Sequence, residues 1–279
     1  MSFIPITPDN PIGTFRKVYL AQTTDEKIKR LRASSGGAVT SLLCYLVEKG
    51  LSDGVVVAKR TKGFEGEAIV ACTREKILKA AGSRWNIVPF TTRLKRVIEE
   101  RGLRRVAIVG LPCQAQFLTQ MRYLPLLETD FGERIFLVVS LFCIGTFAHE
   151  VFLSFLNSKY GVRASQIRDL QLLGDKFVVK LEEGQITVDV KEALTYLQSG
   201  CLLCTDYTGV LADISAGSVS QFPSYTLLLI RSALGEKLVK EAIDENYIVV
   251  REEPEVLTEV RKKALEKIMR ASKYAAQLL

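Results

Sequence analysis

Two apolar stretches constrain the fold more than any other feature of the sequence. Residues 105–110 and 135–142 each form a nearly continuous apolar run, and a helical pattern follows each run, at about 115–122 and about 147–160. A strand that is apolar on both faces is typical of a parallel sheet covered by helices on both sides. We therefore expect an α/β (α+β) protein whose core is a mixed sheet with flanking helices.

Further strands complete the predicted sheet. Residues 54–58 and 68–71 are short apolar runs separated by a glycine-containing turn, which predicts two paired strands. Residues 225–231 predict another buried strand, and residues 247–251 an edge strand. From about 166 to 190 the apolar residues alternate around two glycine-containing turns, and this pattern predicts an antiparallel insertion.

The chain is interpreted as one domain, 1–279, with an attached helical tail. An N-terminal strap (1–17) precedes a cofactor-binding core (18–253), which contains the insertion at about 166–190. Residues 254–279 predict one helix with an apolar stripe among basic residues. The stripe consists of Leu257, Val260, Leu265 and Ile268. Such a helix packs on its own domain or on a partner subunit.

Composition and charge exclude several classes of protein. The formal charge of +7 suits an acidic partner, but the Lys and Arg residues are scattered and no nucleic-acid reader motif accompanies them. We therefore expect no nucleic-acid binding. The apolar runs are too short for a transmembrane segment, and the proline-containing N-terminus lacks a secretory signal. These features predict a cytoplasmic protein, whose cysteines are metal ligands or buried thiols.

Four of the six cysteines lie where a metal site is expected. Cys201 and Cys204 form a C-x-x-C pair, while Cys113 and Cys143 each follow one of the two buried strands. The carboxyl ends of parallel strands meet at one edge of a sheet, where open α/β proteins bind ligands. One C-x-x-C pair with two distant cysteines suits a 4Fe-4S cluster better than a zinc ribbon. Zinc, or no metal, is the alternative.

The other two cysteines and the single histidine carry less functional signal. Cys44 and Cys72 fall inside regular elements, so we interpret them as packed thiols. His149 is the only histidine, which argues against a His-rich metal site, and no serine-nucleophile motif accompanies it, which argues against a Ser-His-Asp triad.

A glycine-rich turn near residue 36 is a candidate anion site. Ser34 or Ser35 is expected to cap the helix that follows, and Gly36-Gly37 supply a tight turn at its start. The unpaired amides of a helix N-terminus can bind an anion. The alternative is an ordinary helix start with glycines that serve packing.

Two further segments are candidates for contact with a ligand. Arg84 can bind a phosphate and Trp85 can cover a ring, or the pair is simply a surface cation beside a half-buried indole. Asp213 precedes the small-residue stretch 215–218, which lets the backbone approach a ligand closely.

Five segments resemble, in their order, the beta-subunit family of coenzyme F420-reducing hydrogenases and formate dehydrogenases. They are SGGAVTSLLCYLVEKGLSDGVVVAK, AGSRW, GLPCQAQFLTQMR, LFC and CLLCTDYTGVLADISAGSVS. The resemblance extends from about residue 18 to about residue 246. It implies an iron-sulfur flavoprotein subunit that passes electrons between coenzyme F420 and a 4Fe-4S cluster through FAD.

The resemblance also implies roles for individual residues. Cys113, Cys143, Cys201 and Cys204 would be the cluster ligands. The residues lining the flavin would be Ser35, Gly36, Gly37, Thr40, Gly82, Ser83, Arg84, Asp213, Ser215, Gly217 and Ser218. No catalytic side chain is expected, because hydride transfer between FAD and the deazaflavin needs no acid or base.

The chain lacks the eight-cysteine ferredoxin module that some members of this family carry. Its electrons would therefore pass to another redox subunit, such as that of a hydrogenase, a formate dehydrogenase or a similar iron-sulfur protein. Two alternatives are a protein with the same cofactors that acts on another organic substrate, such as a tetrapyrrole, and a non-catalytic adaptor whose metal fastens an assembly.

Overall fold

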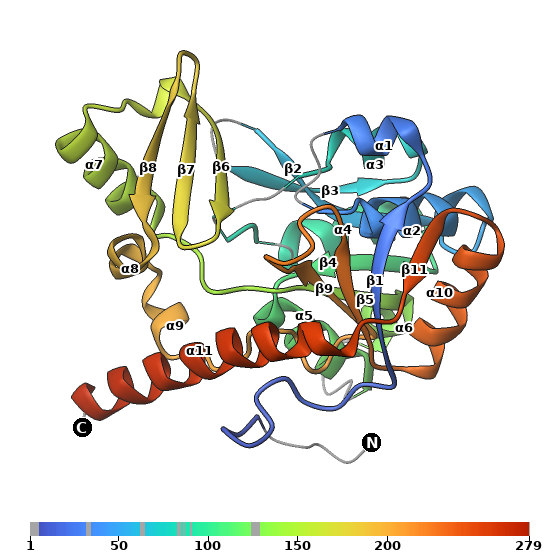
Figure 1. The fold of residues 1–279 in the computed structure, drawn as a ribbon. Helices are drawn as coiled ribbons and strands as arrows, with labels where there is room; N and C mark the ends of the chain where they lie inside the picture. Colours follow the sequence, from blue (N-terminus) through green and yellow to red (C-terminus); the bar gives the residue numbers. More distant parts are fainter. Residues whose placement is uncertain are drawn as a thin grey trace.

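A mixed β-sheet forms the centre of the molecule (Figure 1). The computed structural model describes residues 6–31, 35–61, 65–82, 85, 87–89, 91–123 and 129–278. Within these residues, eight strands form the main sheet in the order β11-β1-β10-β9-β5-β4-β2-β3. Their bounds are β1 (Lys17–Thr23), β2 (Gly54–Arg60), β3 (Gly66–Ala71), β4 (Val106–Gly110), β5 (Ile135–Leu141), β9 (Ile214–Ser218), β10 (Thr226–Ile230) and β11 (Ile248–Arg251). The mixed α/β fold predicted from the sequence is confirmed.

The four strands in the middle of the fold run parallel to one another. β2 pairs with β4, β4 with β5, and β5 with β9, each in parallel register. β3, β10 and β11 pair antiparallel with their neighbours. β1 is antiparallel to β10, which is antiparallel to β9, so β1 points the same way as the parallel strands.

Successive side chains of the parallel strands enter two different cores, because neighbouring side chains in a strand point to opposite faces. Val55 and Ala107 pack on one face, with helices α1 (Glu26–Arg30), α2 (Ala38–Glu48), α3 (Arg74–Lys79) and α10 (Ala233–Asp244). Val56 and Ile108 pack on the other, with α4 (Thr91–Glu100), α5 (Pro112–Tyr123) and α6 (Thr129–Arg134). Burial on both faces explains the continuous apolar runs in the sequence.

The predicted antiparallel insertion is a second, three-stranded sheet with its own core. It consists of β6 (Ile167–Leu173), β7 (Lys176–Leu181) and β8 (Gln185–Asp189). Around it lie α7 (His149–Tyr160), α8 (Val190–Ala193), and the short 3₁₀ helices η1 (Ala164–Gln166) and η2 (Leu194–Tyr196). Its core is aromatic, with the rings of Phe147 and Phe152 stacked 3.9 Å apart. Figure 1 shows the insertion to one side of the main sheet.

The C-terminal tail forms the predicted long helix. After η3 (Pro254–Val256), α11 (Leu257–Leu278) passes below the main sheet and α9 (Ser199–Leu202) in Figure 1. Val260 and Ala264 are buried against the strands β1 and β10. Among the described helices, none combines the length and the apolar character needed to cross a membrane.

Two local predictions were wrong. Helix α2 is not capped by Ser35; its N-cap is Gly37, which has a φ of 71° and makes no capping hydrogen bond through a side chain. Gly36 must instead approach the strands, since a Cβ there would lie 2.5 Å from the carbonyl oxygen of Ala21. Ser34 lies outside the described residues. The stretch 215–218, for which no strand was predicted, is part of the central strand β9.

Candidate functional site

The sequence motifs meet at the edge of the main sheet where the parallel strands end. Cys113 follows β4, Cys143 follows β5 and Ser218 ends β9. The glycine-rich turn that contains Gly36 follows β1 and α1, and the Gly36 carbonyl accepts a hydrogen bond from the N–H of Thr23 at 2.8 Å. The crevice beyond the carboxyl ends of the strands is the usual ligand site of open α/β sheets.

The four cysteines proposed as metal ligands are neighbours at this edge. Cys113 lies in the first turn of α5, Cys201 in α9, and Cys204 two residues after α9. Burial is the main cause that raises the pKa of the Cys143 thiol to about 12; the charge of Lys267 lowers this pKa, and charge on Cys201 and Cys204 raises it. Burial also raises the pKa of Cys113, with further contributions from Cys204 and Cys201. Electrostatic effects of this kind require the sulfur atoms to lie close to one another.

The sulfur of Cys201 has two hydrogen-bond partners on one residue. The N–H of Thr146 donates to it at 3.5 Å, and the Thr146 hydroxyl lies 3.3 Å from it. The N–H of Cys143 donates to the carbonyl of Tyr207 at 2.9 Å, which ties the end of β5 to the segment after Cys204. In the described part of the chain, no three His, Cys, Asp or Glu side chains surround a single metal-ion position. In a 4Fe-4S cluster each thiolate binds a different iron atom, so its sulfurs need not converge on one point.

Two cationic side chains of α11 lie against the same cysteines. Lys267 is only 3% exposed, and its Nζ donates to the carbonyl oxygens of Cys143 and Asp206 at 2.7 and 2.6 Å. Arg270 donates through Nη2 to the carbonyl oxygens of Ile144 and Cys201, at 2.7 and 3.3 Å. The Nε of Arg270 is buried without a hydrogen-bond partner. Neither cation forms an ion pair with a carboxylate of the described residues.

This environment fits an anionic metal-thiolate group. Burial lowers the pKa of Arg270, whereas charge on Cys201, Cys204 and Cys143 raises it. A buried cation is costly unless an anion pairs with it. On binding a metal the cysteines would act as thiolates, and the Nε of Arg270, which has no hydrogen-bond partner, could then pair with the anionic group.

Sequence reasoning missed Lys267 and Arg270, although the signal was present. The tail was interpreted as an apolar stripe between solvated basic residues. The buried positions of α11 include Val260, Ala264 and Ile268, and Lys267 lies on this same helical face. A basic residue on the buried face of an amphipathic helix is a stronger indication of function than the basic residues around it.

Two of the segments assigned to the flavin come together at this edge. The hydroxyl groups of Ser35 and Thr226 lie 2.8 Å apart. Thr226 is paired with Ser218 across the β10–β9 ladder and with Ala21 across the β1–β10 ladder. Ser218 is exposed, and Thr40, in the first turn of α2, is half-buried.

Other residues of the flavin set make internal contacts. Asp213, 2% exposed, forms an ion pair with Arg122 at 2.8 Å and accepts a hydrogen bond from the N–H of Val138 at 2.8 Å. Ser215 is fully buried; its hydroxyl donates to the carbonyl oxygen of Gly209 at 3.1 Å and accepts from the Nε of Arg231 at 2.6 Å. These polar groups hold β9 in place from inside the protein.

The loop after α3 is described only in part. Gly82 is exposed with a φ of 106°, while Ser83 and Arg84 lie outside the described residues. The indole N–H of Trp85 donates to the carbonyl of Leu170 at 2.7 Å, and its ring packs on Phe177 with centroids 4.7 Å apart. Trp85 therefore packs against the core of the insertion as a partly buried indole.

Cys44 and Cys72 are packed thiols, as predicted. Cys44 is fully buried on α2, and burial raises its pKa to about 12. Cys72 is partly buried and packs on the core of the second face. His149 forms a contact of 2.7 Å with the carboxylate of Glu65.

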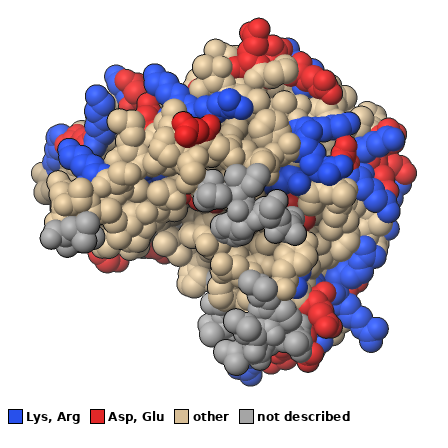
Figure 2. Space-filling view, turned by 90° about the horizontal axis from the view of Figure 1, so that it is seen from below, with Lys and Arg blue, Asp and Glu red and all other residues tan. Residues whose placement is uncertain are grey.

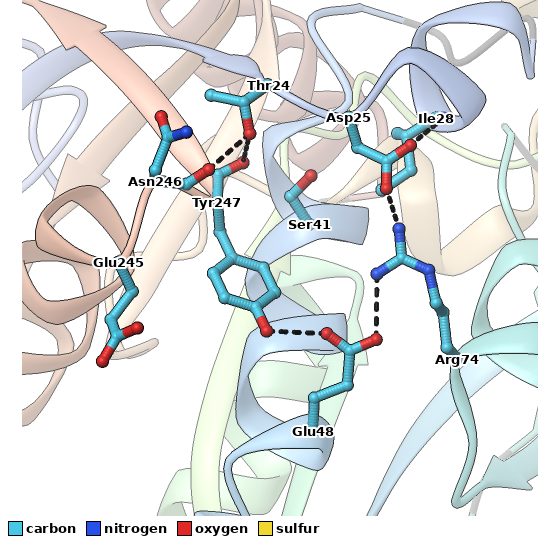
Figure 3. Close-up of a pocket in the computed structure, with 9 residues that line it drawn as sticks. All are labelled: Thr24, Asp25, Ile28, Ser41, Glu48, Arg74, Glu245, Asn246 and Tyr247. Atoms are coloured by element: carbon cyan, nitrogen blue, oxygen red, sulfur yellow. Dashed lines mark hydrogen bonds and ion pairs between the residues drawn. The ribbon is translucent and has the colours of Figure 1, made fainter.

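A polar pocket lies at the far side of α2 and contains none of the predicted site residues (Figure 3). Its volume is about 260 Å³, less than the ~300–1,000 Å³ usual for ligand pockets. Arg74 bridges the carboxylates of Asp25 and Glu48, and the Tyr247 hydroxyl donates to Glu48 at 2.7 Å. The charged groups of this pocket already have partners, Glu245 with Lys49 outside it, and none of the predicted site residues line it, so it is not the candidate site.

Comparison with known proteins identifies the family. The N-terminal part of the family "Coenzyme F420 hydrogenase/dehydrogenase, beta subunit" matches residues 18–95, and the C-terminal part matches residues 103–256. The beta subunit of the coenzyme F420 hydrogenase of Methanosarcina barkeri is 32% identical over 270 residues, which cover 95% of this chain and 92% of that protein. The corresponding subunit of Methanothermobacter thermautotrophicus is 30% identical over 234 residues, 84% of this chain and 83% of that one.

More distant and structural relatives agree. The beta subunit of an F420-dependent formate dehydrogenase of Methanocaldococcus jannaschii is 27% identical over 91% of this chain and 66% of its own length. A chain in the structure of the F420-reducing [NiFe] hydrogenase complex of Methanosarcina barkeri superposes with a TM-score of 0.88 at 32% identity, covering 96% of this chain and 93% of that chain. The protein therefore belongs to the coenzyme F420 hydrogenase/dehydrogenase beta-subunit family and is an oxidoreductase subunit.

Proposed function

We propose that this chain is an iron-sulfur flavoprotein subunit that passes electrons between coenzyme F420 and a partner subunit. FAD would exchange a hydride with coenzyme F420 and single electrons with a 4Fe-4S cluster. One observation carries the proposal: four thiols from three segments lie beside the buried Lys267 and the partly buried Arg270, which have no carboxylate partner among the described residues. The relatives named for coenzyme F420 support the choice of substrate.

The cluster would be held by Cys113, Cys143, Cys201 and Cys204. The hydrogen bonds from Thr146 would orient the Cys201 thiolate. Hydrogen bonds to a ligand sulfur stabilise the reduced form of a cluster, so this contact also affects its potential. The backbone contact between Cys143 and Tyr207 would keep the ligand after β5 in register with the C-x-x-C segment.

The flavin would lie against the turn before α2 and the end of β9. Free amides at the start of α2, which no side chain caps, suit the pyrophosphate of FAD. Ser35, Thr40 and Ser218 would provide hydroxyl groups at the surface of the site. In this proposal Asp213 and Ser215 shape the site from within, because their polar groups already have internal partners.

Binding of coenzyme F420 would use basic residues near the opening. The coenzyme carries a phosphate and a glutamate tail, and both are anionic. We assign Arg84 to this role, and we assign the loop Gly82-Ser83-Arg84 to the lining of the flavin, on the basis of the AGSRW motif alone. The net charge of +7 favours the approach of such a ligand.

A partner subunit would dock where the cluster is nearest to solvent. Cys113 is exposed, and two large apolar side chains close to the other ligands are exposed as well, Leu203 at 46% and Met269 at 70%. Figure 2 shows the molecule from the side on which α11 lies, with tan surface between groups of charged side chains. Exposed apolar residues with a charged rim are typical of protein interfaces.

The ligand set is tested with protein purified without oxygen. Cys113→Ser and Cys201→Ser should each lose most of the bound iron and the cluster absorption, because serine does not replace a thiolate on iron. Cys44→Ser is the matched control, since Cys44 is a buried thiol packed in the core around α2 and is not a proposed ligand, and it should keep its iron. The proposal fails if the wild-type chain binds no iron, or if Cys44→Ser loses iron while Cys113→Ser retains it.

The electron path is tested with the same protein. Reduced coenzyme F420 should bleach the flavin absorption of the wild-type chain and then reduce its cluster. Cys113→Ser should still show flavin bleaching without the reduction of a cluster. Absence of flavin bleaching in a flavin-loaded wild-type chain would contradict coenzyme F420 as the substrate.

A further inference from the structure

Helix α11 places two cations one helical turn apart, the buried Lys267 and the partly buried Arg270, whose Nε is itself buried. Both side chains point to the segments that carry the proposed cluster ligands, since they bond the carbonyls of Cys143 and Cys201. Helix α11 also packs against α9, which contains Cys201. In Figure 1, α11 therefore approaches the segments of the proposed ligands from below the main sheet.

The hydrogen bonds that Lys267 and Arg270 form do not neutralise their positive charges. Lys267 bonds two carbonyl oxygens, and Arg270 bonds two more and leaves Nε without a partner. The carboxylate of Asp206 accepts from the N–H groups of Thr208, Gly209 and Val210 and forms no ion pair with either cation. Neutral carbonyls repay only part of the cost of removing a cation from water.

Packing on the main sheet does not explain why a lysine and an arginine occupy these two positions of α11. If α11 served only to cover the sheet, an apolar residue at position 267 would pack at lower cost, as Val260 and Ala264 do on the same face. The anion that this arrangement lacks is a group bound by the four thiolates. Its net charge is negative in either redox state.

We propose that Lys267 and Arg270 are positioning residues that supply the positive charge for the thiolate-bound cluster and raise its reduction potential. This inference rests on the proposed function above. Reduction adds one electron to the cluster and makes its charge more negative by one. A fixed positive charge nearby therefore stabilises the reduced form more than the oxidised form.

The experiment removes each charge and measures the cluster by redox titration followed by electron paramagnetic resonance. Lys267→Met and Arg270→Met should each shift the one-electron equilibrium toward the oxidised form by on the order of tenfold, which is about 59 mV to more negative potential. Lys267→Arg, which keeps the charge, should retain most of the wild-type potential. Lys262→Met is the matched control, because Lys262 is exposed on the same helix, and it should leave the potential unchanged.

Iron content and circular dichroism complete the test. If Lys267→Met folds as the wild type does but retains no iron, and Lys267→Arg regains it, the charge is required to hold the cluster and the inference stands. If Lys267→Met does not fold, Arg270→Met and Lys267→Arg decide the question. Potentials of Arg270→Met and Lys267→Met equal to that of Lys262→Met would overturn the inference. Failure of the proposed function itself is distinguishable, since the wild-type chain would then bind no iron.

Discussion

At the scale of single residues, the site depends on how closely β9 approaches the end of β5. A Cβ on Gly217 would lie 2.0 Å from Cδ2 of Phe142, so only glycine leaves room for this ring. Phe142 directly precedes Cys143, and its N–H donates to the carbonyl of Ala216 at 2.8 Å. The position of a proposed ligand is therefore set in part by the absence of a side chain on the neighbouring strand.

Substitution of this glycine tests the close approach. Gly217→Ala should lower the free energy of unfolding by about 1–3 kcal/mol, the usual cost of overpacking, as measured by urea denaturation of the iron-free chain. Gly200→Ala is the matched control, because a Cβ at Gly200 would meet no atom within 4 Å. Equal stability of the two variants would show that Phe142 moves aside without cost.

At the scale of secondary-structure elements, the strands that could be predicted are those whose burial on both faces leaves a continuous apolar run in the sequence. β4 and β5 were predicted because they are apolar on both faces, a pattern that is typical of strands inside a parallel sheet. β9 was not predicted as a strand, since its residues are small and partly polar and its burial comes from tertiary packing. The start of α2 was missed for a similar reason: a serine cap is a local preference, and the contact of Gly36 with β1 and β10 overrides it.

The cysteines of the candidate site could be identified from the sequence, but the cations Lys267 and Arg270 could not. The placement of Cys113 and Cys143 after parallel strands follows from the order of strands and helices along the chain. The approach of α11 to the C-x-x-C segment depends on a packing between distant parts of the sequence, which no local pattern encodes. The internal partners of Asp213 and Ser215, which are Arg122 and Arg231, were hidden for the same reason.

The docking of α11 has an acid-sensitive contact at its start. Glu259 accepts hydrogen bonds from the N–H and the hydroxyl of Ser220, at 2.9 and 2.8 Å, and pairs with Lys263 at 2.6 Å. Burial raises the pKa of Glu259, but the bonds from Lys263 and Ser220 outweigh this effect and hold it below its ordinary value of 4.5. The contact therefore adds stability above pH 4.5, and this stability is lost as the pH falls through the lowered pKa.

Replacement of this carboxylate gives the corresponding prediction. Glu259→Gln should lower the free energy of unfolding at neutral pH by about 1 kcal/mol, the order expected for charge-assisted hydrogen bonds at a partly exposed site. The difference from wild type in urea denaturation should shrink as the pH is lowered below 4.5, where the wild-type carboxylate itself becomes protonated. Glu266→Gln, a change on the same helix, serves as the control. A difference that does not depend on pH would contradict this role of the charge.

At the scale of the whole molecule, the thiols lie between two separately packed units. The main sheet supplies Cys113 and Cys143, and its two cores are formed by residues of the parallel strands and the flanking helices. The core of the insertion includes Phe147, Phe177 and Leu197, and Cys201 packs against it. The sulfur of Cys201 is therefore positioned by the insertion and by α11, while two of its proposed partners are positioned by the main sheet. A substitution that destabilises the insertion should therefore displace Cys201 and leave the main sheet folded.

Hydrogen exchange followed by mass spectrometry can separate these two units. Phe177→Ala removes a fully buried ring that contacts Trp85 and Phe147, a change that costs about 3–5 kcal/mol in a packed core. Amide exchange should accelerate in β6, β7, β8 and α9, because local opening follows the stability of the unit to which each amide belongs. Exchange in β4 and β5 should stay at the wild-type rate, and the reconstituted chain should retain less iron as α9 loosens.

Ile108→Val, a small change in the core of the main sheet, is the control and should leave exchange in the insertion unaltered. Equal acceleration throughout the chain in Phe177→Ala would show instead that the insertion and the sheet unfold together, and the cysteines would then depend on a single cooperative core.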